Sequence, residues 1–300
     1  MFQTLTGLYE PSAIQQLPDG RFLIVEDEKQ NPFTLVTINS DERISSKTLN
    51  VGVPEASNPF WKLNDLEAVA LDASGFLYTI TSHSRNSDGD EKKSREKFLR
   101  FRVEGEQLSQ PVLAQGLKPA LIATHPMLAA AAEIKNVKTE GGLNIEALEI
   151  SPNQQHLLIG FRSPLLKQHA LIAYVENPRA IFEAGEAPRI SANLVALDLA
   201  GNGIRSLSYF PSLNGYLIVS GPAASEPVHF QLWFWSGAQD DPPRHVTVPE
   251  LPGFEHAEGI CPAEIDNRQC IMIVSDDGSR EQGRFARFLL LDVGLLQIAS

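Results

Sequence analysis

Five segments of this chain share one pattern, and this repetition constrains the fold more than any other feature. Each segment has a β-type run, a turn rich in Pro, Asp, Asn, Ser or Gly, and a second β-type run that ends in polar residues. The segments are EPSAIQQLPDGRFLIVED from Glu10, DLEAVALDASGFLYTITSHS from Asp65, NIEALEISPNQQHLLIGFRSP from Asn144, GIRSLSYFPSLNGYLIVSGP from Gly203 and HAEGICPAEIDNRQCIMIVSDD from His256. Each segment predicts a β-hairpin.

A third β-type run follows each hairpin, and several units also contain a candidate for a fourth. The third runs are FTLVTI from Phe33, KFLRFRV from Lys97, ALIAYV from Ala170, FQLWFW from Phe230 and RFLLLDV from Arg287. The candidate fourth runs are ISSKTLNV, ANLVALDL, RHVTVPE and, less well patterned, PVLAQG. Four strands per unit make the blade of a β-propeller. We therefore predict an all-β, single-domain propeller over residues 1–300, with five four-stranded blades.

The interval between the second and third units is longer than the others, and a helical insertion explains it. The segment LKPALIATHPMLAAAAEIKNVK is rich in Ala and Leu, which predicts helices near residues 117–137. A six-bladed ring is the alternative if this segment contains a degenerate unit. The N-terminal run QTLTGL belongs to no unit, and the last unit lacks a fourth strand. We expect the N-terminal strand to complete the last blade, which would leave no exposed sheet edge.

Charge and hydropathy restrict the partners of the protein. The chain has 25 Lys and Arg against 37 Asp and Glu, a net charge of −12, which disfavours nucleic acid as a partner. Its most apolar stretches are far shorter than the ~18 residues that span a bilayer, so no membrane insertion is expected. The N-terminus has no basic region followed by an apolar run, and we expect a cytoplasmic protein, with export left open for a trimmed sequence.

Familiar catalytic and metal-binding motifs are absent. The chain has no G-x-S-x-G, H-E-x-x-H, P-loop or G-x-G-x-x-G pattern, so serine hydrolases, zincins and nucleotide-loop proteins find no motif support. The two cysteines, Cys261 and Cys270, are too few for a disulfide framework and have no histidine at zinc-finger spacing. We expect two buried thiols, with a cross-strand disulfide as the alternative.

Alignment of the five units on their first strand brings one polar residue from each into a single column, here called the axial column. Its members are Ser12, Glu67, Glu146, Arg205 and Glu258. The first strands of propeller blades line the central channel, so these side chains are expected to face one another. Oxygen ligands from separate chain positions suit Ca²⁺, which predicts calcium bound by Ser12, Glu67, Glu146 and Glu258. The alternatives are a metal-free network in which Arg205 neutralises the glutamates, or a wrong register.

A second set of residues lies where the second strands end, on the face where the first strands begin. It consists of Glu26, Asp27, His83, Arg162, Asp276 and Asp277. The Arg162 guanidinium suits a phosphate or carboxylate and, with Arg205, is a candidate substrate-binding residue. Asp27, Asp276 and His83 are candidate catalytic residues, because carboxylates and imidazole can move protons near neutral pH. Each of these three residues can instead be a hydrogen-bonded turn residue.

Several blocks resemble a bacterial domain family of unknown function that is expected to form a β-propeller. The blocks are TSHSR, NIEALEISPNQQHLLIGFRSP, GIRSLSYFP with LIVSGP, and AEGI. The resemblance spans nearly the whole chain and implies a fold but no activity.

A more distant resemblance connects the axial column with the calcium-activated nucleotidases of the apyrase type, five-bladed propellers. In that family Ser, Glu, Glu, Ser and Glu surround a central calcium, and this chain departs at the fourth position, Arg205. It also departs from a D-D-R-T block at the end of the first blade's second strand, where it has Glu26, Asp27, Glu28 and Lys29. Phytase-like and lactonase-like propellers have similar acidic channels. These resemblances imply a calcium-dependent hydrolase of a small anionic ester or phosphoanhydride; the alternative is a non-catalytic propeller that binds a ligand or a protein.

Overall fold

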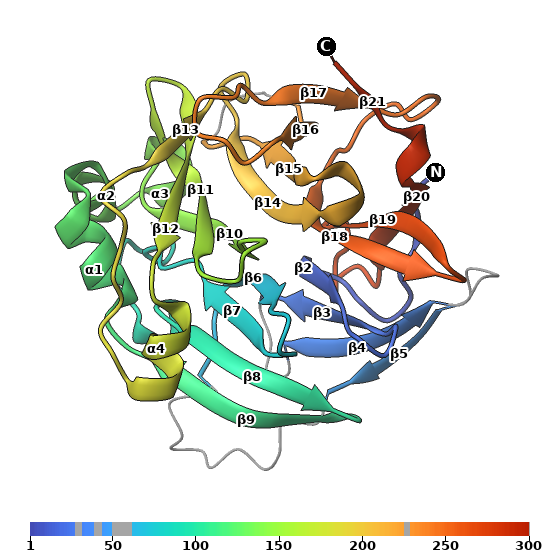
Figure 1. The fold of residues 1–300 in the computed structure, drawn as a ribbon, viewed down its shortest axis with the longest axis horizontal. Helices are drawn as coiled ribbons and strands as arrows, with labels where there is room; N and C mark the ends of the chain where they lie inside the picture. Colours follow the sequence, from blue (N-terminus) through green and yellow to red (C-terminus); the bar gives the residue numbers. More distant parts are fainter. Residues whose placement is uncertain (28–31, 39–43, 50–61, 225–228, 300) are drawn as a thin grey trace.

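The computed structural model describes residues 1–27, 32–38, 44–49, 62–224 and 229–299, and its strands form five antiparallel sheets. The sheets are arranged around a central axis as the blades of a β-propeller (Figure 1). Four sheets have four strands, and the remaining one has a fifth strand at its outer edge. The predicted all-β propeller is confirmed, with five blades and not six.

The two innermost strands of each blade come from the hairpins that the repeat predicts. The innermost strands are β2 (Pro11–Gln16), β6 (Leu66–Leu71), β10 (Asn144–Ile150), β14 (Gly203–Phe210) and β18 (Ala257–Ile265). The second strands are β3 (Phe22–Glu26), β7 (Leu77–Thr81), β11 (Leu157–Leu166), β15 (Gly215–Gly221) and β19 (Arg268–Ser275). Most residues of the second strands are buried, because each lies between two strands of its sheet and between neighbouring blades.

The two outer strands complete each blade. The third strands are β4 (Phe33–Ile38), β8 (Phe98–Glu104), β12 (His169–Val175), β16 (Gln231–Trp235) and β20 (Arg287–Asp292). The outermost strands are β5 (Ile44–Thr48), β9 (Gln107–Ala114), β13 (Val195–Leu197) and β17 (Arg244–Thr247). The four candidate fourth runs of the sequence overlap these strands.

Both ends of the chain add short strands to the last two blades. The N-terminal β1 (Gln3–Thr4) pairs antiparallel with β20, so the fifth blade combines the first and last parts of the chain. The C-terminal β21 (Gln297–Ile298) pairs with β17 at the outer edge of the fourth blade. These pairings connect the two ends of the chain to the ring and cover two sheet edges that would otherwise be open.

The insertion between the second and third blades is helical, as predicted. It contains α1 (Leu117–Thr124), α2 (Pro126–Ala132) and α3 (Val137–Glu140). Leu121 and Leu128 are fully buried in a cluster that also contains Phe161 of β11. A further helix, α4 (Pro178–Ala184), follows β12 and packs into the same cluster. Burial of these apolar side chains fixes the insertion against the third blade.

Two further expectations concern the cysteines and the membrane. Cys261 and Cys270 are both free and buried; Cys261 pairs with Met272 and Cys270 with Ala263 across the β18–β19 ladder. The structure therefore contains two buried thiols and not the alternative disulfide. In the described part of the chain, no helix has the length and apolarity needed to cross a bilayer.

Candidate functional site

A β-bulge marks the position of the axial column in every innermost strand. The pairing register shifts on either side of Ser12, Glu67, Glu146, Arg205 and Glu258, so that each of these residues is skipped in the ladder with the second strand. A bulge bends the strand locally and redirects a side chain, and bulges are frequent beside functional sites. The repeated bulge thus turns one polar side chain per blade toward the axis.

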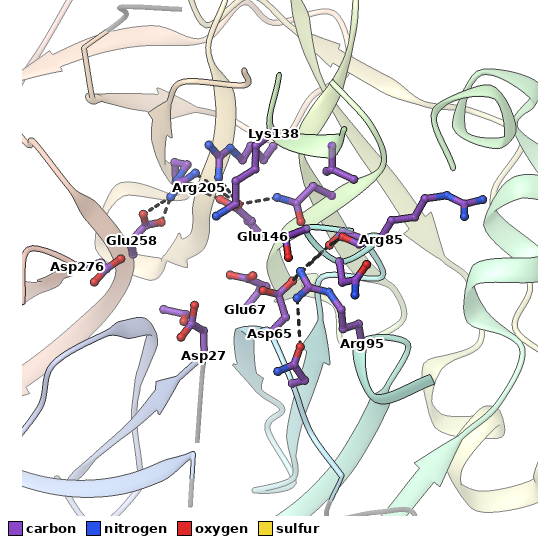
Figure 2. Close-up of a pocket in the computed structure, with 18 of the residues that line it drawn as sticks. Asp27, Asp65, Glu67, Arg85, Arg95, Lys138, Glu146, Arg205, Glu258 and Asp276 are labelled. Carbon is purple, nitrogen blue, oxygen red and sulfur yellow. Dashed lines mark hydrogen bonds and ion pairs between the residues drawn. The ribbon is translucent and has the colours of Figure 1, made fainter. Parts of the chain in front are cut away.

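These five side chains line a cavity of roughly 600 Å³ at the axis, here called the axial cavity (Figure 2). Its walls also contain many other charged groups. The carboxylates of the wall are Asp27, Asp65, Glu67, Glu146, Glu258 and Asp276. The cationic side chains are Arg85, Arg95, Lys135, Lys138, Arg162 and Arg205. The axial cavity therefore contains the whole axial column together with Asp27, Arg162 and Asp276 of the second set.

Arg205 binds two of the column's glutamates. Its guanidinium makes a bidentate ion pair with Glu258, with Nε donating to Oε2 at 2.9 Å, and its Nε lies 3.0 Å from Oε2 of Glu146. Only 4% of the Glu146 side chain and 10% of the Arg205 side chain are exposed. Burial lowers the pKa of Arg205, but Glu146 and Glu258 outweigh this and raise it. Arg205 thus stays charged and neutralises this side of the cavity, as the metal-free alternative expects.

Arg162 reaches the same cavity from the end of β11. Its Nη1 donates to Oε1 of Glu146 at 3.1 Å and its Nε donates to the carbonyl of Pro222 at 2.9 Å. The strand carrying Arg162 passes so close to β14 that a Cβ on Gly203 would lie 1.9 Å from the Arg162 carbonyl oxygen. A glycine at position 203 is therefore required for this approach, and the two strands hold the guanidinium at the cavity wall.

Glu67 differs from the other column glutamates in its surroundings. Among the described residues, no ion pair connects its carboxylate to a cationic side chain. Burial raises the pKa of Glu67 well above the usual value of a glutamate, and Asp65, Glu146, Asp27 and Glu258 add to the rise by repulsion. Several carboxyl groups therefore surround Glu67 in the axial cavity.

A cluster that the sequence did not identify lies beside Glu67. Asp65 precedes β6 and makes an ion pair with Arg95, while Arg95 also donates to Ser84 Oγ at 2.8 Å and to Asn64 Oδ1 at 3.1 Å. Asp65 has a left-handed backbone, with φ of 64°. Ser84 belongs to the TSHSR block of the sequence. The repeat of the blades, however, does not indicate Arg95 as the partner of Asp65. Arg95 thus compensates Asp65, whereas the neighbouring Glu67 has no ion-pair partner among the described residues.

The predicted catalytic residues separate into two groups. Asp27 and Asp276 line the axial cavity, at the ends of β3 and β19 (Figure 2). Asp276 is open to the cavity, yet the protein around it raises its pKa to about 6, first by burial and then by repulsion from Glu10. The neighbouring Asp277 pairs instead with Arg287. Glu28 and Lys29, which follow Asp27, lie outside the described residues.

His83 is not among the residues that line the axial cavity. Its side chain is 2% exposed, and neither ring nitrogen has a hydrogen-bond partner among the described residues. Burial, together with the nearby Lys118, lowers the pKa of His83 to about 3. The imidazole is therefore neutral across the physiological range and lies apart from the cluster of candidate catalytic groups.

The donor set of the cavity has the chemistry that calcium prefers, but the column glutamates are not equally available. Glu146 and Glu258 are engaged by Arg205, whereas Glu67 and the Ser12 hydroxyl are not paired with it. Within the described residues, no three His, Cys, Asp or Glu side chains are already grouped to hold a metal ion. The part of the cavity lined by Ser12, Asp27, Glu67 and Asp276 is here called the acidic side, and its oxygen donors are of the kind that Ca²⁺ accepts.

Comparison with protein families matches residues 115–289, more than half of the chain, to a family described as proteins of unknown function, DUF3616. The chain belongs to the DUF3616 family. The resemblance to a propeller family of unknown function is thereby confirmed, whereas the resemblance to calcium-activated nucleotidases and phytase-like propellers is not. Comparison of this DUF3616 protein with curated proteins gives no match.

Comparison of the DUF3616 protein with solved structures gives matches along most of the chain at low sequence identity. A GH43 β-1,3-galactosidase has a TM-score of 0.54 and 9% identity, covering 99% of this chain and 98% of its own. A candidate oxidoreductase (glucose dehydrogenase) from Thermus thermophilus has a TM-score of 0.48 and 17% identity, covering 97% and 99%. The PQQ-bound aldose sugar dehydrogenase from Streptomyces coelicolor has a TM-score of 0.43 and 14% identity, covering 97% and 98%. At 9% identity, the similarity to the galactosidase supports a shared fold and gives no ground for a shared chemistry.

Proposed function

We propose that the axial cavity is the active site of a calcium-dependent hydrolase that acts on a small anionic ester or phosphoanhydride. The observation that carries this proposal is the uncompensated Glu67 carboxylate, whose pKa is raised by burial and by four neighbouring carboxylates. A divalent cation would relieve this repulsion. Carboxyl groups with strongly perturbed pKa values inside a cavity are typical of functional sites, which supports chemistry at this place.

In this proposal the residues of the acidic side hold the cation and move a proton. Ser12, Asp27 and Glu67 would bind calcium, which would polarise the reacting oxygen of the substrate. Asp276, with a pKa of about 6, is mostly ionised at pH 7 and suits a general base. Its carboxylate would accept a proton from water as the water oxygen bonds to the reacting carbon or phosphorus. The proton would then pass to the leaving oxygen as the old bond breaks.

The opposite side of the cavity would position the substrate. Arg162 is held by Glu146 and the Pro222 carbonyl, so its guanidinium is oriented before a ligand arrives. A guanidinium fixed in this way can bind an anionic oxygen of the substrate without a large loss of side-chain entropy. Arg205 would keep Glu146 and Glu258 neutralised.

A second candidate function is a non-catalytic propeller that binds a small ligand or a protein at the same cavity. The observation that favours it is the Arg205 network, which compensates Glu146 and Glu258 without a metal. In this alternative, calcium changes neither ligand binding nor stability.

The test is a substrate panel measured with calcium and again with a chelator. The panel contains nucleoside di- and triphosphates, phosphomonoesters, lactones and carboxylic esters. We expect turnover of at least one anionic class, and we expect the chelator to abolish it because the reacting oxygen loses its polarising cation. Absence of turnover across the panel, with the protein shown to be folded and saturated with calcium, would contradict the hydrolase and favour the binding propeller.

A further inference from the structure

The cationic side chains of the axial cavity are not equally compensated. Arg95, Arg162 and Arg205 pair with carboxylates of the cavity itself, and Arg85 pairs with Glu133 outside it. Among the residues that the structure describes, no ion pair connects Lys135 or Lys138 to a carboxylate. These two exposed lysines, here called the cationic wall, line the cavity, and the nearby charge of Lys135, after that of Lys92, helps to lower the pKa of Asp90.

The cationic wall belongs to the helical insertion, which is fixed against the third blade. Five consecutive residues, 135–139, line the cavity around the start of α3. Val137 is buried, and the chain that follows is held by a hydrogen bond from the Leu143 N–H to the Ala131 carbonyl at 3.1 Å. The Ser163 hydroxyl of β11 also donates to the carbonyl of Gly142. The backbone that carries the lysines is thus held against the third blade, and both lysine side chains are exposed.

Carboxyl groups without an ion-pair partner among the described residues lie elsewhere in the cavity. Glu67 comes from the second blade and Asp276 from the fifth, and neither is joined by an ion pair to a cation within the described residues. Lys138 is separated from Asp27, Glu67 and Asp276 in Figure 2, with Glu146 and Arg205 labelled nearer to it. The lining of the axial cavity therefore combines carboxyl groups of the acidic side, from the first, second and fifth blades, with the cationic wall from the helical insertion.

We propose that the cationic wall binds an oxyanion of the substrate that is distinct from the group that reacts. The substrate would then be a small organic molecule with a phosphate or carboxylate at Lys135 and Lys138 and its reacting bond at the acidic side. A cavity of roughly 600 Å³ falls within the ~300–1,000 Å³ range of sites for small organic ligands and can hold more than a single inorganic ion. This assignment rests on the proposed function for the reacting group, but the binding of the oxyanion is independent of turnover.

The test measures binding of matched probes by calorimetry, with calcium and with a chelator. Each set differs in the anionic group alone: glucose, glucuronate and glucose 6-phosphate; adenosine and AMP; glycerol and glycerol 3-phosphate. We expect an anionic member of at least one set to bind at least tenfold more tightly than its neutral member. The first set distinguishes a carboxylate from a phosphate as the preferred oxyanion. If no anionic probe binds more tightly than its neutral partner, the proposal is wrong.

Two variants separate the cationic wall from general electrostatics. Replacement of both lysines, Lys135→Gln with Lys138→Gln, should remove the preference for the anionic probe and leave the affinity for its neutral partner unchanged. Arg268→Gln removes one positive charge from the exposed β18–β19 turn at the opposite end of the strands and should have no effect. Unchanged probe affinity in the double variant would overturn the proposal.

Failure of this inference can be distinguished from failure of the proposed function. If the panel shows no turnover but the double variant loses its affinity for the anionic probe, the cationic wall is a binding site and the proposed hydrolase function is wrong. If turnover is chelator-sensitive but the double variant keeps its KM and probe affinity, the proposed hydrolase function is supported and the proposed oxyanion site at the cationic wall is wrong.

Discussion

Replacement of Arg205 by alanine is expected to destabilise the protein by about 3–5 kcal/mol, because it leaves Glu258 without its ion-pair partner and leaves the buried Glu146 with Arg162 alone. Glu146 is 4% exposed, and both Glu146 and Glu258 contact this guanidinium. Burial raises the pKa of Glu258 while Arg205 opposes that rise, so loss of Arg205 also favours protonation of Glu258. Urea unfolding followed by circular dichroism measures the free energy of unfolding.

The matched control is Arg21→Ala. Arg21 pairs with Asp19 at 2.5 Å in an exposed turn, where an ion pair contributes at most ~1 kcal/mol. A loss for Arg205→Ala no larger than that for Arg21→Ala would show that the Arg205 network is not what compensates the buried glutamates. Arg205→Lys keeps the charge but loses the bidentate contact, and we expect an intermediate stability.

Replacement of Asp276 by asparagine is expected to lower kcat by ~10²–10⁴-fold once a substrate is known, because the general base is lost. The pKa of about 6 also sets the pH dependence of the wild type. The base must be ionised, so kcat should fall as the pH drops through about 6 and should level off above it. A pH profile of kcat for the wild type and the variant measures both effects.

Asp277→Asn is the control for this prediction. Asp277 is the next residue in the chain, but its carboxylate pairs with Arg287 and accepts from Ser275 Oγ at 3.0 Å. The control should keep its kcat and its pH profile. Equal kcat in Asp276→Asn and Asp277→Asn would remove Asp276 from the mechanism.

The blades and the axial column could be predicted because they repeat. A hairpin that recurs five times fixes equivalent positions, and equivalent positions must converge when the sheets form a ring. The repeat alone therefore predicts that Ser12, Glu67 and Arg205 lie close together. The β-bulge at each of them has no uniform signal in the sequence: Pro11 precedes Ser12, but no glycine or proline adjoins Glu67 or Arg205.

The remaining features of the site depend on residues outside the repeat. Arg95 follows a loop and Lys138 belongs to the insertion, so neither has a counterpart in the other blades. Which carboxylate Arg205 binds also depends on side-chain geometry, which periodicity does not encode. His83 shows the same limit: its sequence context is equally compatible with a proton carrier and with the buried imidazole that the structure contains.

Calcium titration of the wild type and of Glu67→Gln by calorimetry at pH 6 and pH 8 tests the central claim most directly. The raised pKa of Glu67 means that a proton competes with calcium for its carboxylate. We predict binding with release of a proton, a higher affinity at pH 8 than at pH 6, and loss of binding in Glu67→Gln. Glu264→Gln, in an exposed part of β18, should bind as the wild type does. Absence of calcium binding at both pH values, or equal binding by Glu67→Gln, would contradict the assignment of the acidic side as a calcium site.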